Sequence, residues 1–248
     1  MAKGIQAQDK TPSVAMSSGR SDTVLTALLL VTGVLMLGNL ALIFLWVPLE
    51  QSMGILFLIF YFHVPLALAG FLAMGIVFIS SILYLWKRQG KWDALAHSAA
   101  EIGVLFITLT IITGSIWAKA FNGVWWTWDP RLTTTLILWL MYVGYLMVRA
   151  YAPTPSQAAR YSAVMGVISF IDVPIVYFSA VWWRNIIHPN LYLGPLAEQG
   201  SLDSRMEAAV MFSLFAFTVL LACLVWERLA QRYSEDTLQE VRYAKGAY

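Results

Sequence analysis

Two of the three histidines, His63 and His188, stand in stretches rich in aromatic residues. His63 directly follows a tyrosine and a phenylalanine, and His188 lies shortly after the pair Trp182-Trp183. Neutral imidazole is the commonest metal ligand in proteins, so two rings that converge from different loops could coordinate one metal from opposite faces. The alternative is that each ring makes an ordinary hydrogen bond at an interface. The residues alone leave both readings open.

A third aromatic stretch, residues 117–131, has three tryptophans within four positions. These are Trp125, Trp126 and Trp128, and Trp117 precedes them. Closely spaced indoles form a flat surface that can stack on a planar apolar ligand, and each indole N–H can donate a hydrogen bond. Scattered tryptophans are explained by an aromatic belt at head-group level, but anchoring one loop needs only one or two indoles. The stretch therefore predicts a stacking surface.

Asp129 and three basic residues flank these aromatic stretches. Asp129 stands before Pro130, which predicts a helix N-cap followed by proline at the first helical position. Arg131, Arg184 and Lys119 could pair with carboxylates, arginine bidentately; contact with phospholipid head groups is the alternative. A flat apolar macrocycle with acidic arms and a central metal would use the histidines, indoles and basic residues together. Haem meets all three requirements.

Membrane-spanning helices must position these residues. Of the 248 residues, 59% are hydrophobic and 12% are charged, which is about half the charged share of a soluble domain. The sequence therefore predicts an all-α, polytopic membrane protein with six transmembrane helices. A span needs roughly 20 apolar residues, and six stretches meet this requirement: 23–47, 64–86, 96–117, 133–148, 162–181 and 204–226.

The second span requires a division of the long apolar run 53–86. At 1.5 Å per residue this run would outreach a hydrocarbon core of about 30 Å. Pro65 predicts where the division falls, because proline is favoured in the first turn of a helix. The segment 54–62 is then expected at the outer interface, with His63 at its boundary.

The basic residues predict the orientation. Of the 16 Lys and Arg residues, 12 lie in the two tails and in the connections after the second and fourth spans, and 4 lie on the other side. By the positive-inside rule, both termini are cytoplasmic. The first 22 residues lack the pattern of a cleaved signal peptide. The connections expected to face outward are 48–63, 118–132 and 182–203.

This orientation divides the chain into three parts. Residues 1–22 are expected to form a cytoplasmic N-terminal tail, and residues 227–248 a cytoplasmic C-terminal tail. Between them, residues 23–226 are expected to form the six-helix membrane domain, with an outward Trp-rich loop at 118–132. Within the C-terminal tail, Ser234 is expected to cap a short helix.

Two acidic residues and several absences bear on function. Asp172 inside the fifth span and Glu101 near the inner end of the third are candidates either for a proton path or as partners of a buried donor. Pro174 allows a purely local explanation for Asp172, and neither residue receives a role. The sequence has no P-loop, no CxxCH motif and no nucleophile triad, and its lone Cys223 excludes an internal disulfide. A net charge of +2 is too small to indicate nucleic-acid binding. These features favour binding and handover over enzymatic chemistry.

The sequence resembles the haem-handling WWD-motif membrane proteins, most closely the CcmC family of system I cytochrome c maturation. Two positions depart from the family pattern: Asn122 stands where another tryptophan is usual, and Val124 where threonine or alanine is common. One stacking surface is therefore expected to be smaller. The resemblance covers nearly the whole chain and rests on six spans in about 250 residues, on the stretches 61–65 and 125–129, on Arg131-Leu132-Thr133, and on Trp182-Trp183 upstream of His188.

The resemblance implies that His63 and His188 are the axial ligands of a transiently and non-covalently bound haem b. The Trp-rich loop would cradle this haem at the periplasmic face of the bacterial inner membrane. The implied partners are the haem chaperone CcmE and an ABC-type transporter complex with CcmA, CcmB and CcmD, in which CcmA hydrolyses ATP. The residues expected to contact haem are His63, His188, Trp117, Trp125, Trp126, Trp128, Asp129, Arg131 and Arg184.

Two other functions remain open. The first is a permease that moves haem or another small solute through the bundle, with Asp172 and Glu101 along its path. The second is a b-type cytochrome electron carrier, in which paired histidines should lie near the middle of the membrane. His63 and His188 are instead expected at the outer rim, where a second protein can reach the haem, so handover is the first expectation.

Overall fold

The computed structural model describes residues 18–51, 53–183 and 203–244, and nearly all of them are helical. A short π-helix, η1 (Leu42–Trp46), continues the first long helix, and a short 3₁₀-helix, η2 (Ile55–Ile59), precedes the second. No β-strand occurs in these ranges. The long elements are α1 (Ser18–Ala41), α2 (Phe60–Lys87), α3 (Gly90–Asn122), α4 (Pro130–Tyr151), α5 (Pro155–Ser169), α6 (Asp172–Trp182) and α7 (Ser204–Ala244).

Six helical segments in this part of the chain are long and apolar enough to cross a membrane, which confirms the predicted fold class. Three of them are composite, because η1 continues α1, η2 joins α2, and the pair α5–α6 forms a single span. The segments are Thr23–Trp46, Ile55–Lys87, Gly90–Asn122, Pro130–Tyr151, Pro155–Ser179 and Ser204–Glu235.

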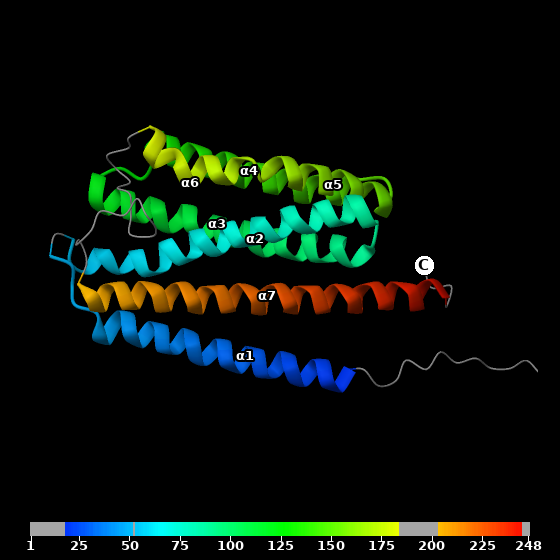
Figure 1. The fold of residues 1–248 in the computed structure, drawn as a ribbon, viewed down its shortest axis with the longest axis horizontal. Helices are drawn as coiled ribbons and strands as arrows, with labels where there is room; N and C mark the ends of the chain where they lie inside the picture. The colour runs from blue at the N-terminus through cyan, green and yellow to red at the C-terminus, as the bar shows by residue number, and fades with distance from the viewer. Residues whose placement is uncertain (1–17, 52, 184–202, 245–248) are drawn as a thin grey trace, which may run out of the picture.

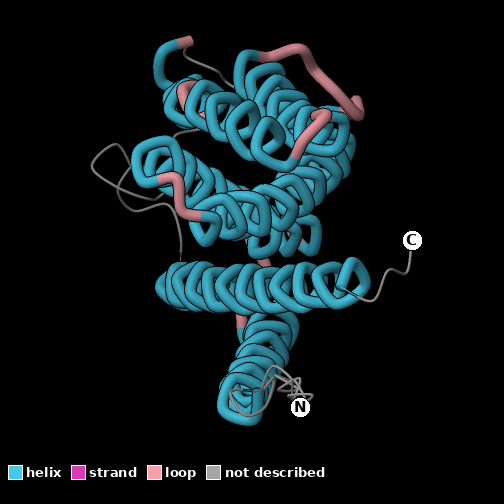
Figure 2. The backbone as a smooth tube through the Cα atoms, turned by 90° about the vertical axis from the view of Figure 1, so that its right-hand side faces the viewer, coloured by secondary structure: helices cyan, strands magenta, loops and turns pink. Residues whose placement is uncertain are grey.

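The helices form a bundle with α2 and α3 at its centre (Figure 1). Helices α4, α5 and α6 lie on one side of this pair, and α7 lies on the other side, with α1 beyond it (Figure 2). The start of α1 and the end of α7 lie at the same end of the bundle, here called the termini end. The loop between α3 and α4 lies at the opposite end, here called the Trp-loop end.

The central pair is held together where glycines let side chains of the other helix approach. A methyl group on Gly70 of α2 would lie 2.6 Å from Cδ1 of Ile107, and one on Gly103 of α3 would lie 2.8 Å from Cε of Met74. Ile107 and Met74 are fully buried. Each helix thus fills a gap left by a glycine in its neighbour, which gives dense packing.

The structure corrects the predicted start of the second span. η2 leads directly into α2 at Phe60, so Pro65 lies inside the helix and the segment 54–62 is not a separate interfacial stretch. Phe57 and Phe60 are buried here, and their burial outweighs the one hydrogen bond that a proline near the helix start removes. His63 consequently lies in the first turn of α2.

The structure also corrects the fifth span, which is broken at residues 170–171 rather than continuous. Pro174 has no N–H to donate to the Phe170 carbonyl, and the Val173 N–H takes its place at 3.1 Å. Asp172 begins α6 at this break and is 8% exposed. Its Oδ2 has no hydrogen-bond partner among the described residues. Pro174 therefore explains the break in the helix, and Asp172 remains without an assigned role.

Helix α7 is a single helix of 41 residues, so the predicted separate helix at 234–244 is wrong. Ser234 does not cap a new helix; its hydroxyl donates to the Ala230 carbonyl at 3.1 Å, one turn back. At 1.5 Å per residue α7 is about 60 Å long, roughly twice the hydrocarbon thickness. Part of α7 therefore lies outside the hydrocarbon core.

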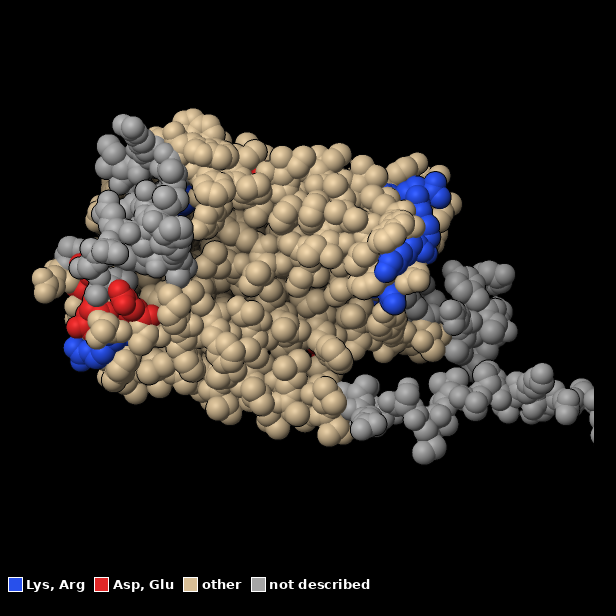
Figure 3. Space-filling model, in the orientation of Figure 1, with Lys and Arg blue, Asp and Glu red and all other residues tan. Residues whose placement is uncertain are grey.

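Charged residues in the described part of the chain gather at the two ends of the bundle. On the face drawn in Figure 3, Lys and Arg lie at the termini end, acidic and basic residues lie at the Trp-loop end, and a broad uncharged surface separates them. On α1 this surface includes Leu30 and Leu37, each about two-thirds exposed at 67% and 68%. Such an apolar band is what lipid contact requires.

Candidate functional site

His63 is held in one orientation by α3. Its Nδ1 lies 3.0 Å from the hydroxyl of Thr113, and that hydroxyl donates its only proton to a backbone carbonyl, that of Leu109 at 2.8 Å. The hydroxyl must therefore accept from the ring, so Nδ1 carries the proton and Nε2 carries the lone pair. This is the tautomer in which Nε2 can coordinate a metal.

The close approach of His63 to α3 depends on Gly114. A methyl group at this position would lie 2.9 Å from Cε1 of the imidazole, which is closer than carbon atoms pack. Trp117, one turn further along α3, meets the same imidazole edge to face, with ring centroids 5.8 Å apart and planes at 86°. The ring is thus fixed by a hydrogen bond and by two contacts with α3.

Trp117 belongs to an aromatic wall beside His63. Its ring also meets Phe57 at 6.4 Å and Phe60 at 5.8 Å, both nearly perpendicular. Edge-to-face pairs of this kind add to the energy of burial. Trp117 therefore supports the imidazole from within the bundle rather than offering an open stacking face.

The Trp-rich loop follows directly from α3. Gly123 ends the helix with φ +76°, a left-handed conformation that glycine adopts without strain, and its N–H donates to the Lys119 carbonyl at 3.1 Å. The Lys119 ammonium returns to the Gly123 carbonyl at 2.8 Å. Lys119, predicted to flank the site, thus closes the end of α3.

The three loop tryptophans differ in exposure. Trp125 is 60% exposed and Trp128 is 75% exposed. Trp126 is half-buried and meets Trp128 edge to face at 5.8 Å. Its buried indole N–H has no acceptor within the described ranges. The loop therefore presents the indole faces of Trp125 and Trp128, an arrangement suited to stacking on a flat ligand.

Asp129 acts as the N-cap of α4, which confirms the structural prediction for it. One carboxylate oxygen accepts from the backbone N–H groups of Arg131 at 3.0 Å and Leu132 at 3.2 Å. The other accepts from the Thr127 hydroxyl at 2.8 Å, and Pro130 takes the first helical position. Asp129 thus fixes the end of the Trp-rich loop to α4.

Arg131 joins α4 to α6 at this end of the bundle. Its Nη2 donates to the Tyr177 carbonyl at 3.1 Å. A guanidinium has five N–H donors, so this bond leaves capacity for a carboxylate. At the end of α6, Trp182 and Trp183 are more than half exposed, at 58% and 55%.

The predicted site residues divide into three groups. His63 and Trp117 are in direct contact, and Trp125, Trp126, Trp128, Asp129 and Arg131 lie together in the loop and the first turn of α4. His188 and Arg184 lie outside the described residues. Sequence reasoning missed Thr113 and Gly114; the spacing of Thr113 and Trp117, one turn apart on one helix face, was the available signal.

Comparison with known proteins gives a consistent result. Residues 10–243 match the family described as CcmC, Heme exporter protein C. The chain is 34% identical over 188 residues to Heme exporter protein C of Bradyrhizobium diazoefficiens, covering 75% of this chain and 72% of the relative. It is 31% identical over 182 residues to the Escherichia coli K12 protein of the same name, covering 73% and 72%.

A further relative of that name, from Haemophilus influenzae, is 32% identical over 194 residues, covering 78% of this chain and 76% of the relative. The family match extends over all six candidate membrane spans and over the aromatic residues around His63. This protein therefore belongs to the CcmC (heme exporter protein C) family.

Proposed function

We propose that this protein binds haem at the periplasmic face of the bacterial inner membrane and passes it to the haem chaperone CcmE. Family membership gives the chain a role in haem handling for cytochrome c maturation as a multi-pass membrane subunit. The proposal refines this role by naming a site, a face of the membrane and a recipient. The site comprises His63, His188 and the Trp-rich loop.

The orientation of His63 is the observation that carries the proposal. Because Thr113 holds the proton on Nδ1, the Nε2 lone pair is the one suited to iron. A metal-binding histidine commonly has its second nitrogen fixed in this way by a neighbouring acceptor. His188 is proposed as the second axial ligand on the grounds of its sequence context alone.

The Trp-rich loop is proposed as the surface on which the macrocycle lies. Trp125 and Trp128 offer exposed indole faces, and the half-buried Trp126 supports Trp128 edge to face. Arg131, and by its sequence position Arg184, would pair with the acidic arms of the haem. These contacts are non-covalent, and they lie at a rim that a second protein can reach.

Haem that is coordinated at the Trp-loop end by ligands on two separate segments can be released in two steps. One Fe–N bond loosens while the recipient supplies its own ligand, so the haem is at no point fully released. His63 lies within α2 and is held by α3, so we propose that its bond to iron is kept until the recipient binds. The His188 bond is therefore proposed to open first.

The proposed assembly and orientation follow from the family and from the charge distribution. CcmA, CcmB and CcmD are the proposed partners, and CcmA would hydrolyse ATP, since this chain carries no P-loop. The basic residues at the termini end support a cytoplasmic position for residues 1–22 and 227–248. The membrane domain would then span 23–226, with the Trp-loop end in the periplasm.

A permease remains the second candidate because Asp172 is buried in the bundle with one carboxylate oxygen lacking a partner in the described ranges. Replacing Trp125 and Trp128 together by alanine separates the two functions. Haem stacking requires these indoles, whereas a solute path inside the bundle does not. The third candidate, a b-type cytochrome, gains no support from the described ranges, because the two histidines in them, His63 and His97, lie at opposite ends of the bundle.

The proposal is tested by absorbance of purified His63→Ala and by its loading of CcmE. We expect haem per folded protein to fall at least tenfold, with CcmE loading falling in parallel. His97→Ala is the matched control, because it removes a histidine at the termini end and should leave the haem spectrum unchanged. Wild-type haem content in both His63→Ala and His188→Ala would refute the proposed ligands.

A further inference from the structure

The turn between α2 and α3 carries three basic residues at the termini end, remote from the proposed haem site. Lys87 ends α2, Arg88 follows it, and Lys91 lies in the first turn of α3. All three residues are exposed, and none of them takes part in the proposed haem site. These three residues are here called the basic turn.

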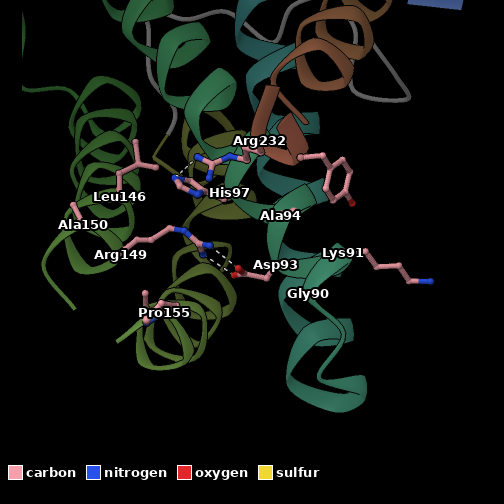
Figure 4. Close-up of a pocket in the computed structure, with 12 residues that line it drawn as sticks. Gly90, Lys91, Asp93, Ala94, His97, Leu146, Arg149, Ala150, Pro155 and Arg232 are labelled. Carbon is pink, nitrogen blue, oxygen red and sulfur yellow. Dashed lines mark hydrogen bonds and ion pairs between the residues drawn. The ribbon is translucent and has the colours of Figure 1, made fainter. Parts of the chain in front are cut away.

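The cations of the basic turn form no ion pair with a carboxylate within the described ranges. The nearest acidic residue in the sequence, Asp93, pairs with Arg149 of α4. Figure 4 shows Asp93 and Arg149 facing one another and Lys91 pointing away from both. The arginines of α7 at this end of the bundle are paired with carboxylates as well. In the described part of the chain, the basic turn therefore keeps three positive charges that no carboxylate compensates.

Aromatic rings are the described partners of these cations. Each cation lies over a ring, 5.1 to 5.9 Å from its centroid: Lys87 over Trp86, Arg88 over Tyr84 and Lys91 over Trp92. A cation–π contact at an exposed site is weak, and the ring covers only one side of the charged group. The N–H donors of the basic turn are therefore accessible to a ligand from outside the protein.

Arg88 has a backbone conformation that arginine seldom adopts. Its φ is +56°, and it is the one non-glycine residue with positive φ in the described ranges. Its N–H ends α2 by donating to the Tyr84 carbonyl at 2.8 Å. Glycine does this without strain, as Gly123 does at the end of α3. Ending the helix therefore does not require an arginine, which indicates that the side chain has another use.

The surface of α2 that leads to the basic turn indicates the ligand. Ile79, Ile82 and Trp86 lie along one side of the helix and are 58%, 41% and 77% exposed. An exposed apolar face of this kind contacts lipid chains, and a tryptophan at its end lies at head-group level. The cations follow Trp86 directly, and their long side chains reach the height of the lipid phosphates. Unpaired cations at this height attract anionic lipids.

We propose that the basic turn binds the phosphate groups of anionic phospholipids in the leaflet at the termini end. The two ammonium groups and the guanidinium donate to phosphate oxygens, and Trp86 lies beside the adjoining ends of the acyl chains. This contact holds the turn between α2 and α3 at head-group level. It does not involve haem, so it can fail without affecting the proposed function.

The test follows quenching of tryptophan fluorescence in the full, haem-free protein. The protein is placed in phosphatidylcholine nanodiscs with an increasing share of a lipid brominated on its acyl chains close to the head group. The difference between wild type and Trp86→Phe isolates the signal of Trp86. We expect brominated phosphatidylglycerol to quench Trp86 at a lower share than brominated phosphatidylcholine does, and added salt to weaken this preference. Equal quenching by the two lipids would overturn the proposal.

Two soluble probes distinguish the lipid from other anions. Inorganic phosphate or polyglutamate is added to discs that contain brominated phosphatidylglycerol, with sodium chloride of the same ionic strength as the reference. We expect neither probe to relieve the quenching of Trp86 more than sodium chloride does. Greater relief by phosphate would reassign the basic turn to free phosphate, and greater relief by polyglutamate would reassign it to an acidic protein segment.

Variants locate the effect, each measured against the same variant with Trp86→Phe. Arg88→Gly removes the guanidinium and suits the observed φ, so the turn should fold as in wild type. Its preference for phosphatidylglycerol should fall about fivefold, and adding Lys87→Gln and Lys91→Gln should abolish the preference. Arg205→Gln is the control, because it removes a half-exposed cation at the Trp-loop end, and its preference should equal that of wild type. An unchanged preference in the triple variant would overturn the proposal.

Discussion

The two ends of the bundle secure their helices by different means. At the termini end, carboxylates on α3 pair with arginines on two other helices: Asp93 with Arg149 of α4, and Glu101 with Arg228 and Arg232 of α7. At the Trp-loop end, the described polar side chains bind mainly to backbone groups, as Asp129 does at the start of α4 and Arg131 does at Tyr177.

This difference separates stability from ligand binding. Ion pairs between helices hold the bundle together but use the charged groups for that purpose. A cap such as Asp129, which binds backbone N–H groups and a neighbouring hydroxyl, fixes the course of the loop and leaves its indole faces available. Substitutions at the termini end should therefore lower the stability of the fold, and substitutions at the Trp-loop end should lower the affinity for haem.

The largest effect is expected for Glu101→Ala. This change leaves Arg228 and Arg232, whose side chains are only 25% and 15% exposed, without their shared carboxylate. Removing one partner of a buried pair costs about 3 kcal/mol or more. Because these arginine side chains are partly exposed, we expect the free energy of unfolding to fall by an amount near the lower end of that range. Denaturant titration in mixed micelles measures it.

Glu235→Ala is the matched control for Glu101→Ala. Glu235 also pairs with Arg228, at 3.2 Å, but its side chain is 57% exposed. An exposed pair contributes at most about 1 kcal/mol, so this variant should unfold nearly as wild type does. Equal losses in the two variants, or a loss of haem per folded Glu101→Ala protein, would contradict the separation of the two ends.

A smaller effect, on haem alone, is expected for Thr113→Val. Valine has nearly the shape of threonine but cannot accept the Nδ1–H of His63, so the tautomer and the ring orientation are no longer fixed. Loss of such a partner typically weakens metal binding about 10- to 100-fold. Haem titration followed by absorbance measures the change, and Thr113→Ser, which keeps the hydroxyl, should bind as wild type does. Unchanged affinity in Thr113→Val would argue against His63 as an iron ligand.

The smallest effect is expected for Asp129→Ala. It removes the cap from two backbone N–H groups of α4 and the acceptor of Thr127. Loss of an N-cap costs about 1 kcal/mol, and the Trp-rich loop loses its attachment to α4, so haem affinity should fall severalfold. Asp129→Asn retains capping ability. If Asp129→Asn lost as much haem as Asp129→Ala did, the carboxylate charge rather than the cap would be responsible.

Hydropathy was sufficient to predict the number of spans, and the Asp129-Pro130 pair was sufficient to predict a helix entry. Both depend on local composition, and both were confirmed. The start of the second span could not be read in this way, because it depends on tertiary burial of Phe57 and Phe60 against Trp117. Pro65 is a local signal, and tertiary packing overrides it.

The site itself was only partly predictable. Motif reasoning identified His63 and the Trp-rich loop, but it did not find Thr113, because threonine on a membrane helix usually bonds to its own backbone. Thr113 does that as well, and only the packing of α2 on α3 shows that the same hydroxyl also accepts from His63. The spacing of Thr113 and Trp117 on one face of α3 is visible in the sequence, but it does not reveal this second role of the hydroxyl.

The glycine gaps between α2 and α3 bear on how accurately the imidazole is placed. Gly70, Gly103 and Gly114 each admit a side chain from the opposite helix, and the last of these side chains is His63. Sliding one helix along the other would drive all three side chains out of register at once. The height of the imidazole above the membrane midplane is therefore set by interlocking side chains along the whole helix pair, and not by the contacts of His63 alone.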